Sequence, residues 1–132
     1  MSPEELVGYA KEAKELSYSP YSHFAVGAAL LTKEGKVYKG ANIENSSYGL
    51  SMCAERNAVY HALMEGVSPD EFAALALIGD TDEPISPCGA CRQVLSEFFD
   101  KDTPIYMASK EGKIYESSIK DLLPYAFEGD VL

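Results

Sequence analysis

Two segments with helical spacing of apolar residues stand between predicted strands, and this alternation restricts the fold more than any other feature of the sequence. Residues 54–65 and 88–99 both place apolar side chains at intervals of three and four residues, as an amphipathic helix does. The continuous apolar run 72–79 lies between them and is typical of a buried strand. Helices that connect strands act as crossovers, so the sequence predicts an α/β fold with a mixed sheet covered on both faces.

The remaining predicted elements surround this centre. Ser2 is placed to cap a first helix, with Pro3 at its first position and Glu5 able to complete a capping box. Strands are predicted over 24–32, 37–42, 105–109 and 114–117, and a last short helix over 118–123. The order of elements is then αββαβαββα. The predicted buried stripe of the first helix comprises Leu6, Tyr9, Ala10, Ala13 and Leu16.

Length and charge exclude several classes of protein. A chain of 132 residues with 46% apolar composition fits a single domain, which we predict to span residues 1–132. The net charge of −10 repels phosphate backbones and anionic lipid, so neither nucleic acid nor a membrane is an expected partner. The sequence has no apolar run of the roughly 20 residues that span a bilayer, and its first residues lack a signal-peptide pattern. We therefore expect a cytoplasmic protein.

The three cysteines indicate a metal site. Cys53 lies where a loop enters the second predicted helix, and Cys88 and Cys91 lie where a strand leads into the third. A helix N-terminus favours thiolates, and a Cys-x-x-Cys pair directs both sulfurs to one side of the first turn. Three thiolates that converge on Zn²⁺ leave its fourth tetrahedral position open, which is typical of a catalytic site. The two histidines of the chain, His23 and His61, are poorly placed to be a fourth ligand.

Glu55 is the candidate catalytic residue. It follows Cys53 by two positions, which suits a general base that takes a proton from water at the zinc and passes it to a leaving amine. Each group also has a plainer interpretation. The cysteines alone could be small buried residues, and Glu55 alone could be an acidic residue that favours a first helical turn. The spacing of the four residues together favours the zinc site.

The segments around these residues resemble a known family. Cys-Ala-Glu at 53–55 and Pro-Cys-Gly-Ala-Cys at 87–91 match the signature of the zinc nucleobase deaminases. With residues 19–30, 42–45, 53–56 and 86–93, the sequence resembles the small, three-cysteine class of cytidine deaminases. The resemblance implies a three-layer αβα sandwich with a five-stranded mixed sheet and one zinc ion per subunit. It also implies hydrolytic deamination of cytidine and 2′-deoxycytidine in pyrimidine salvage, by a homotetramer with active sites shared between subunits.

The resemblance assigns several residues to the substrate. Asn42 and Glu44 match the binders of the ribose hydroxyls, and at positions i and i+2 of an extended segment they face the same side. Phe24 matches a residue that packs on the base, although phenylalanine at the start of a strand is more often part of a core. The main-chain N–H of Ala54 and the carbonyl of Ser86 match groups that contact the pyrimidine edge and its amino group.

Two further matches concern neighbouring subunits. Tyr48 and Phe127 correspond to groups that one subunit contributes to the site of another. Two positions depart from the family pattern: Tyr125 stands where a small residue is expected, and Asn57 stands where threonine is expected. Tyr125 lies in the segment that would form the lid of the site, whereas Asn57 lies outside the proposed ligands.

Arg56 is expected to tune the metal. Three thiolates around Zn²⁺ give a formal charge of −1, which weakens the ion as a Lewis acid. Arg56 stands in the first turn of a predicted helix, where a cation is unfavourable to the helix dipole and therefore suggests a specific anionic partner. Hydrogen bonds from its guanidinium to ligand sulfurs would withdraw negative charge. A surface arginine paired with one of the many carboxylates is the alternative.

Other functions stay open at this stage. A deaminase of another substrate, such as an aminonucleoside antibiotic or a base in tRNA or single-stranded DNA, would use the same chemistry. The net negative charge disfavours the polymer substrates, and residues 42–45 disfavour the antibiotic. A zinc-stabilised binding or assembly module without turnover is the alternative from another class. The lack of a fourth ligand and the presence of Glu55 argue against it.

Overall fold

The structure, a computed structural model, describes residues 1–129, so the last three residues of the predicted domain lie outside it. Within the described residues the helices and strands follow the predicted order αββαβαββα, with two short 3₁₀ turns added. None of these helices has the length and apolar content needed to cross a membrane. The elements are α1 (Pro3–Lys14), β1 (Val26–Thr32), β2 (Val37–Ala41), η1 (Tyr48–Leu50), α2 (Ala54–Met64), η2 (Pro69–Glu71), β3 (Phe72–Gly79), α3 (Gly89–Phe98), β4 (Ile105–Ala108), β5 (Ile114–Ser117) and α4 (Ile119–Leu122).

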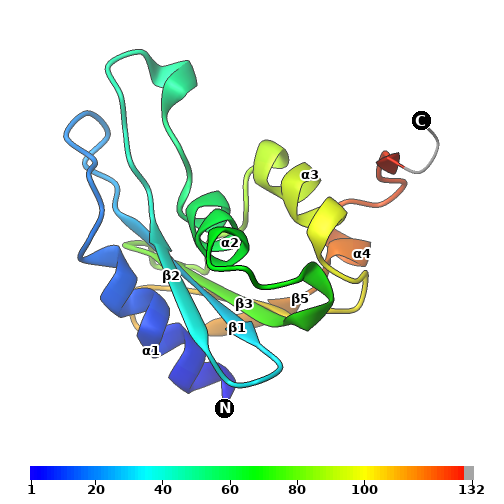
Figure 1. Cartoon of the computed structure of the whole chain (residues 1–132). Coiled ribbons are helices and arrows are strands. Elements are labelled where there is room, and N and C mark those ends of the chain that lie inside the picture. The colour runs from blue at the N-terminus through cyan, green and yellow to red at the C-terminus, as the bar shows by residue number, and fades with distance from the viewer. Residues whose placement is uncertain (130–132) are drawn as a thin grey trace.

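The strands form one mixed sheet in the order β2-β1-β3-β4-β5. Strand β1 pairs antiparallel with both β2 and β3, and β4 pairs antiparallel with β5. Strand β3 pairs parallel with β4, with Leu75 opposite Ile105. A parallel pair needs a crossover connection, and α3 supplies it across one face of the sheet (Figure 1). The predicted mixed sheet is therefore confirmed.

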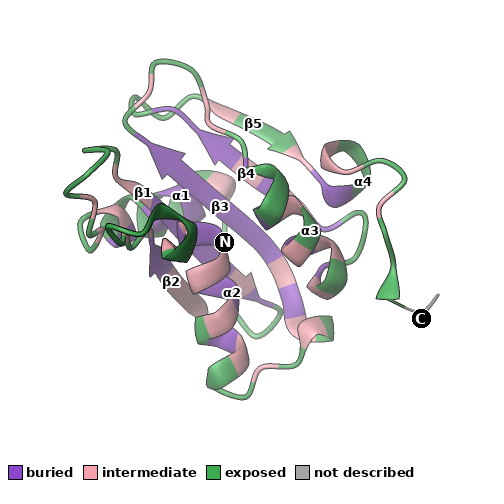
Figure 2. Cartoon of the chain, turned by 90° about the horizontal axis from the view of Figure 1, so that it is seen from above, coloured by how far each residue is buried: buried purple, intermediate pink, exposed green. Residues whose placement is uncertain are grey.

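Helices cover both faces of the sheet, which makes three layers. Helix α1 lies on one face, and α2, α3 and α4 lie on the other (Figure 1). Side chains alternate along each strand, so β1 sends Ala29 toward α1 and Leu30 toward α2 and α3. Strands β1 and β3 are almost wholly buried, while β5 and the outer sides of the helices are exposed (Figure 2). The predicted αβα sandwich is confirmed.

The predicted buried stripe of α1 is partly wrong. The capping box of Ser2 and Glu5 is present, but the helix ends at Lys14, so Leu16 lies beyond it and is 67% exposed. The residues of α1 that face the sheet are Leu6, Val7, Ala10 and Ala13. Val7 thus replaces Tyr9, whose side chain lies at the flank of the helix with its ring centroid 5.8 Å from the Lys39 ammonium. Small alanines on the inner side let the helix approach the sheet closely.

Two glycines allow helices to pack directly on strand backbone. A Cβ atom added to Gly27 of β1 would lie 2.0 Å from the carbonyl oxygen of Ala10 in α1. A Cβ atom added to Gly40 of β2 would lie 2.3 Å from the nitrogen of Ala58 and 2.5 Å from the carbonyl oxygen of Ala54, both in α2. Because backbone cannot move aside as a side-chain end can, Gly40 fixes the distance between β2 and the start of α2.

Gly40→Ala is expected to lower the free energy of unfolding by about 1–3 kcal/mol, because the methyl group overpacks the contact between β2 and α2. Gly8→Ala in α1 is the matched control. An added Cβ at Gly8 meets nothing within 4 Å, and alanine is favoured over glycine in a helix by roughly 0.5–1 kcal/mol. Urea unfolding of both variants checks the expectation. A Gly40→Ala protein as stable as the parent would contradict the close approach.

Candidate functional site

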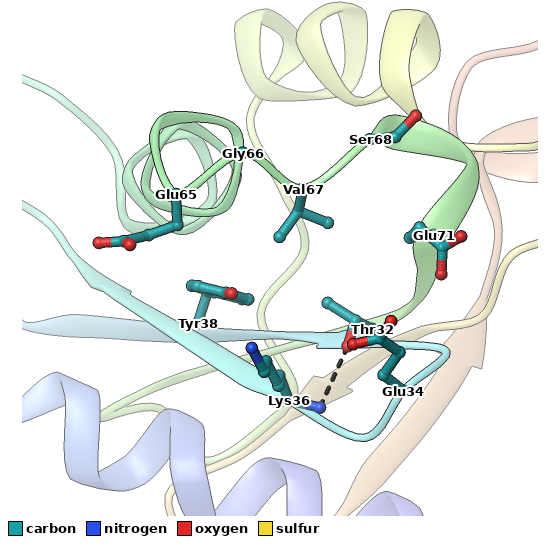
Figure 3. Close-up of a pocket in the computed structure, with 9 residues that line it drawn as sticks. All are labelled: Thr32, Glu34, Lys36, Tyr38, Glu65, Gly66, Val67, Ser68 and Glu71. Carbon is teal, nitrogen blue, oxygen red and sulfur yellow. Dashed lines mark hydrogen bonds between the residues drawn. The ribbon is translucent and has the colours of Figure 1, made fainter.

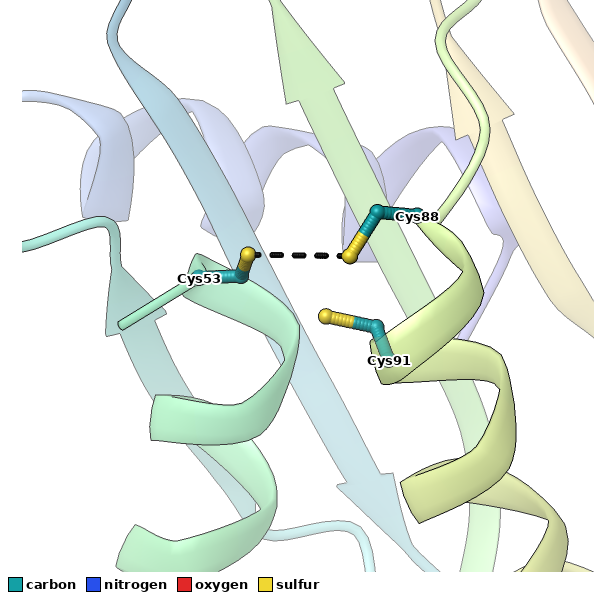
Figure 4. Close-up of side chains that lie close together, drawn as sticks. All are labelled: Cys53, Cys88 and Cys91. Atoms are coloured by element: carbon teal, nitrogen blue, oxygen red, sulfur yellow. Dashed lines mark hydrogen bonds between the residues drawn. The ribbon is translucent and has the colours of Figure 1, made fainter. Parts of the chain in front are cut away.

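Three cysteine sulfurs meet where the first turns of α2 and α3 face each other. Cys53 is the N-cap residue of α2, Cys88 is the N-cap residue of α3, and Cys91 lies in the first turn of α3. Their sulfur atoms all lie within 4.8 Å of one another, and those of Cys53 and Cys88 are 3.8 Å apart (Figure 4). Tetrahedral Zn–S bonds of about 2.3 Å place sulfurs about 3.8 Å apart, so the three residues fit one zinc ion.

The three cysteines predicted to bind the metal lie close enough together to do so. Within 1–129, these cysteines form the only group of three or more potential metal ligands of the types His, Cys, Asp and Glu. The histidines lie elsewhere: the Nδ1 atom of His61 is 3.1 Å from the Lys39 carbonyl oxygen, and His23 is in an exposed turn. Three soft sulfur donors and an open fourth position suit zinc with a reactive water molecule.

Glu55 lies beside the sulfurs and is 4% exposed. Burial, with a smaller contribution from the negative charge of Cys53, raises the pKa of Glu55 to about 7. The thiols are also strongly perturbed. Hydrogen bonds from Cys91 and then from Arg56 lower the pKa of Cys53 to about 5, whereas donation to Cys53 and burial raise the pKa of Cys91. A carboxyl group that titrates near neutral pH can both accept and release a proton.

Arg56 contacts the sulfur cluster, as the charge argument predicts. Its Nη2 atom lies 3.5 Å from the Cys53 sulfur, and hydrogen bonding to that sulfur raises the pKa of the guanidinium. The side chain is only partly buried and makes no salt bridge to a carboxylate within residues 1–129. The alternative of a surface ion pair therefore has no support in these residues.

A cavity of about 650 Å³ opens onto Cys53, Cys88 and Glu55. Six of the residues expected to contact substrate line it: Phe24, Asn42, Glu44, Tyr48, Ala54 and Ser86. Tyr48 lies at the cavity of its own chain, and its expected contribution to a neighbouring subunit stays a prediction. Phe127 does not line this cavity; its carbonyl oxygen accepts a hydrogen bond from the Gln93 side chain at 3.3 Å, on another part of the surface.

The Asn42 side chain joins three segments at the cavity wall. Its Nδ2 donates to the Phe24 carbonyl oxygen at 2.8 Å, and its Oδ1 accepts from the Val26 N–H at 2.9 Å. The Ser17 hydroxyl also donates to Oδ1. Both acceptor positions of the amide are therefore in use, and one N–H of Nδ2 remains for a ligand. Ser17 could not be recognised from the sequence, because no spacing rule links it to Asn42.

The Glu44 carboxylate holds the loop that precedes Phe24. Oε1 accepts the N–H groups of Tyr21 at 3.0 Å and of Ser22 at 3.1 Å, and Oε2 accepts the Ser22 hydroxyl. These bonds, with the Ser22 hydroxyl first, lower the pKa of Glu44. The Ser22 oxygen in turn accepts the Phe24 N–H at 3.0 Å. Ser22 lines the cavity although it was not among the predicted site residues.

A second cavity lies away from the cysteines, between the β1–β2 hairpin and the end of α2 (Figure 3). Its volume is about 340 Å³. Two of its lining residues are joined by a hydrogen bond of 3.1 Å from the Lys36 N–H to the Thr32 hydroxyl. Three carboxylates and one lysine surround it, but no thiol or histidine lies among its lining residues. The reactive groups of the described residues are concentrated at the larger cavity.

Comparison with known proteins gives a consistent result. Residues 1–107 match the family described as "Cytidine and deoxycytidylate deaminase zinc-binding region". A cytidine deaminase of Sporosarcina psychrophila is 48% identical over 132 residues, which are 100% of this chain and 96% of that protein. A crystal structure of cytidine deaminase from Burkholderia pseudomallei is 50% identical, with a TM-score of 0.94 over 96% of this chain and 100% of that one. The Mycobacterium tuberculosis enzyme is 38% identical, with a TM-score of 0.81 over 96% and 98%.

Proposed function

This chain belongs to the cytidine deaminase family, and from that premise we propose that it converts cytidine and 2′-deoxycytidine to the corresponding uridine nucleosides and ammonia. The observation that carries the proposal is a three-sulfur zinc site beside a buried carboxyl group at one cavity. The product is a free pyrimidine nucleoside, and we propose that the enzyme serves pyrimidine salvage in the cytoplasm.

Glu55 carries the protons of the proposed reaction. When bound, zinc supplies a Lewis acid that activates water for attack on the ring. Glu55 takes up the two protons of the attacking water in turn, and it delivers the first to N3 of the cytosine ring and the second to the departing amino group. Its pKa of about 7 supports this double role, because neither its charged nor its neutral form is strongly disfavoured at neutral pH.

The cavity wall supplies the proposed contacts to the nucleoside. Asn42 retains one N–H that can donate to a ribose hydroxyl, and Glu44 retains about one of its four lone-pair positions to accept from one. Phe24 offers a ring to the base. The Ala54 N–H, at the free N-terminus of α2, and the Ser86 carbonyl group are available to the pyrimidine edge.

An absorbance assay tests the proposal. The purified zinc protein is incubated separately with cytidine, 2′-deoxycytidine, adenosine and cytosine, and the change in ultraviolet absorbance is followed while released ammonia is measured. We expect turnover of the two cytosine nucleosides alone. Turnover of adenosine would indicate another deaminase specificity. Absence of turnover with zinc bound would favour a zinc-stabilised binding module.

We propose that the active protein is a homotetramer in which Tyr48 and Phe127 complete the sites of neighbouring subunits. Both side chains are large, apolar and exposed, at 61% and 57% of their full areas, which supports a role at an interface. Sedimentation at the concentration of the activity assay is expected to give about four times the 14.4 kDa mass of the chain. A monomer with full activity would contradict the shared site.

Arg56→Gln is expected to slow the enzyme at pH 7, because the variant loses the charged donor to the Cys53 sulfur. The zinc would then carry more negative charge from its thiolates and be a weaker Lewis acid. The measurement is kcat for cytidine with zinc content determined on the same samples; a loss of roughly 10-fold or more is the scale expected for an outer partner of a metal ligand. A variant with full zinc and unchanged kcat would assign Arg56 a role unrelated to the metal.

A further inference from the structure

The distribution of arginine in this chain is uneven. Of its 11 basic residues only Arg56 and Arg92 are arginines, and both lie on the helices that carry the cysteines. Arg56 follows Cys53 by three positions and donates to its sulfur. Arg92 follows Cys91 directly, yet no hydrogen bond joins it to a sulfur within residues 1–129. Arg92 therefore contacts the site in a different way.

The Arg92 guanidinium joins the loop before α3 to the end of α4, which lies 30 residues beyond Arg92 in the sequence. Its Nε donates to the carbonyl oxygen of Pro87 at 2.8 Å, and its Nη1 donates to the carbonyl oxygen of Leu122, at the end of α4, also at 2.8 Å. Its Nη2 lies 3.2 Å from the Ser86 hydroxyl. The main-chain N–H of Arg92 donates to the carbonyl oxygen of Cys88 at 2.9 Å.

These bonds fix both peptide units on either side of one zinc ligand. The Pro87 carbonyl belongs to the peptide unit before Cys88, and the Cys88 carbonyl belongs to the peptide unit after it. The side chain of Arg92 holds the first of these units and its main chain holds the second. The same side chain ties this loop to α4, so the backbone of the exposed ligand Cys88 is held from outside its own turn.

We propose that Arg92 is a positioning residue of the zinc site, which sets the main chain of residues 86–88 and thereby the direction of the Cys88 sulfur. The proposal rests on the zinc site of the proposed function but not on its substrate. Arg92 acts through Cys88 and not by contact with metal or nucleoside. Because its three donors form a rigid fork, Arg92 keeps the loop and α4 in one fixed relation.

A lysine at position 92 cannot do the same. Lysine has one ammonium nitrogen on a flexible stem, whereas Arg92 reaches the Pro87 and Leu122 carbonyl oxygens from two different nitrogens, Nε and Nη1, of one rigid group. Arg92→Lys therefore keeps the positive charge while it removes at least one of the bonds to Pro87 and Leu122. The substitution separates the geometric role from a simple electrostatic one.

The test is the rate at which the folded protein releases zinc to an excess of a chromogenic chelator, well below the melting temperature. Arg92→Lys is expected to release zinc about 10–100 times faster than the parent, the range typical for partners of metal ligands. The Co²⁺-substituted variant is expected to show altered d–d bands, since the thiolate geometry changes. Lys120→Gln is the matched control: it removes an exposed cation of α4 whose one salt bridge within residues 1–129 is to Asp102, and release should be unchanged.

A purely structural role predicts a different pattern. The melting temperatures of the zinc-free and zinc-loaded variant would fall by equal amounts, and zinc release and the Co²⁺ spectrum would stay at parent values; this result overturns the proposal. If Arg92→Lys does not fold, Ser86→Ala removes one acceptor of the same fork, and an unchanged release rate there overturns it as well. None of these measurements uses cytidine, so an inactive parent enzyme would refute the proposed reaction without affecting the result for Arg92.

Discussion

Glu55→Gln is expected to lower kcat for cytidine by at least about 10²-fold and to leave zinc and fold in place. Glutamine has nearly the volume of glutamic acid and fits the same buried position, where Glu55 is 4% exposed. It cannot take up or release a proton near pH 7, whereas burial raises the pKa of Glu55 to about 7 and makes both steps accessible. The reaction needs two proton deliveries, so one substitution affects both. Steady-state kinetics with parallel zinc analysis measures the effect.

Glu65→Gln is the matched control for this substitution. Glu65 is the C-cap residue of the same helix, α2, and its exposed carboxylate makes one long contact of 4.0 Å with His61. Its exchange should change neither kcat nor zinc content. Near-normal turnover of Glu55→Gln with zinc bound would remove Glu55 from the mechanism. Loss of zinc from the variant would instead give the carboxylate a role in metal binding.

Cys88→Ala is expected to abolish stoichiometric zinc binding and, with it, deaminase activity. Two thiolates would remain, and a catalytic zinc site is typically held by three protein ligands. Because Cys88 is exposed at the cavity and its neighbours pack little against its side chain, the sheet and its helices should still form. Metal analysis of the purified variant, with circular dichroism for the fold, provides the measurement. Undiminished zinc would refute the assignment of this ligand.

Gly89→Ala controls for disturbance of the same helix start. Gly89 is exposed and is the first residue of α3, and a Cβ atom added there meets nothing within 4 Å. The variant should therefore keep one zinc per chain and parent activity. Loss of zinc from Gly89→Ala would show that the turn itself, and not the Cys88 sulfur, limits metal binding.

Much of the fold is predictable because the decisive signals are local. The continuous apolar run of β3 predicts its bounds to the residue, and the Ser2 cap and Glu5 predict the start of α1. Helix starts at Cys53 and Cys88 follow from the flanking strands and turns, and the Cys-x-x-Cys spacing then brings two sulfurs to one side. A metal site built at two helix N-termini can therefore be predicted from the sequence, because the signals for both helix starts are local.

What the sequence leaves open depends on contacts in space. The side of α1 that faces the sheet is decided by Gly27 and the alanines packed on it, and hydrophobic periodicity alone favours the larger Tyr9. Ser22 and Arg92 donate to groups that only the folded chain brings near them, the Glu44 carboxylate and the Leu122 carbonyl oxygen. Phe127 lies away from the cavity beside the cysteines of its own chain. A single sequence does not indicate whether a residue contacts the site of its own subunit or that of a neighbour.

The parallel pairing of β3 with β4 also bears on the order in which the site matures. The pair Cys88 and Cys91 belongs to the crossover between these strands, while Cys53 belongs to the connection between β2 and β3. Pairings between distant segments form late, since the intervening chain must first be closed into a loop. A ribosome must therefore deliver the chain through Ala108 before all three sulfurs can be held together. We therefore expect the three-thiol site to become complete late in synthesis, after β3 and β4 have paired.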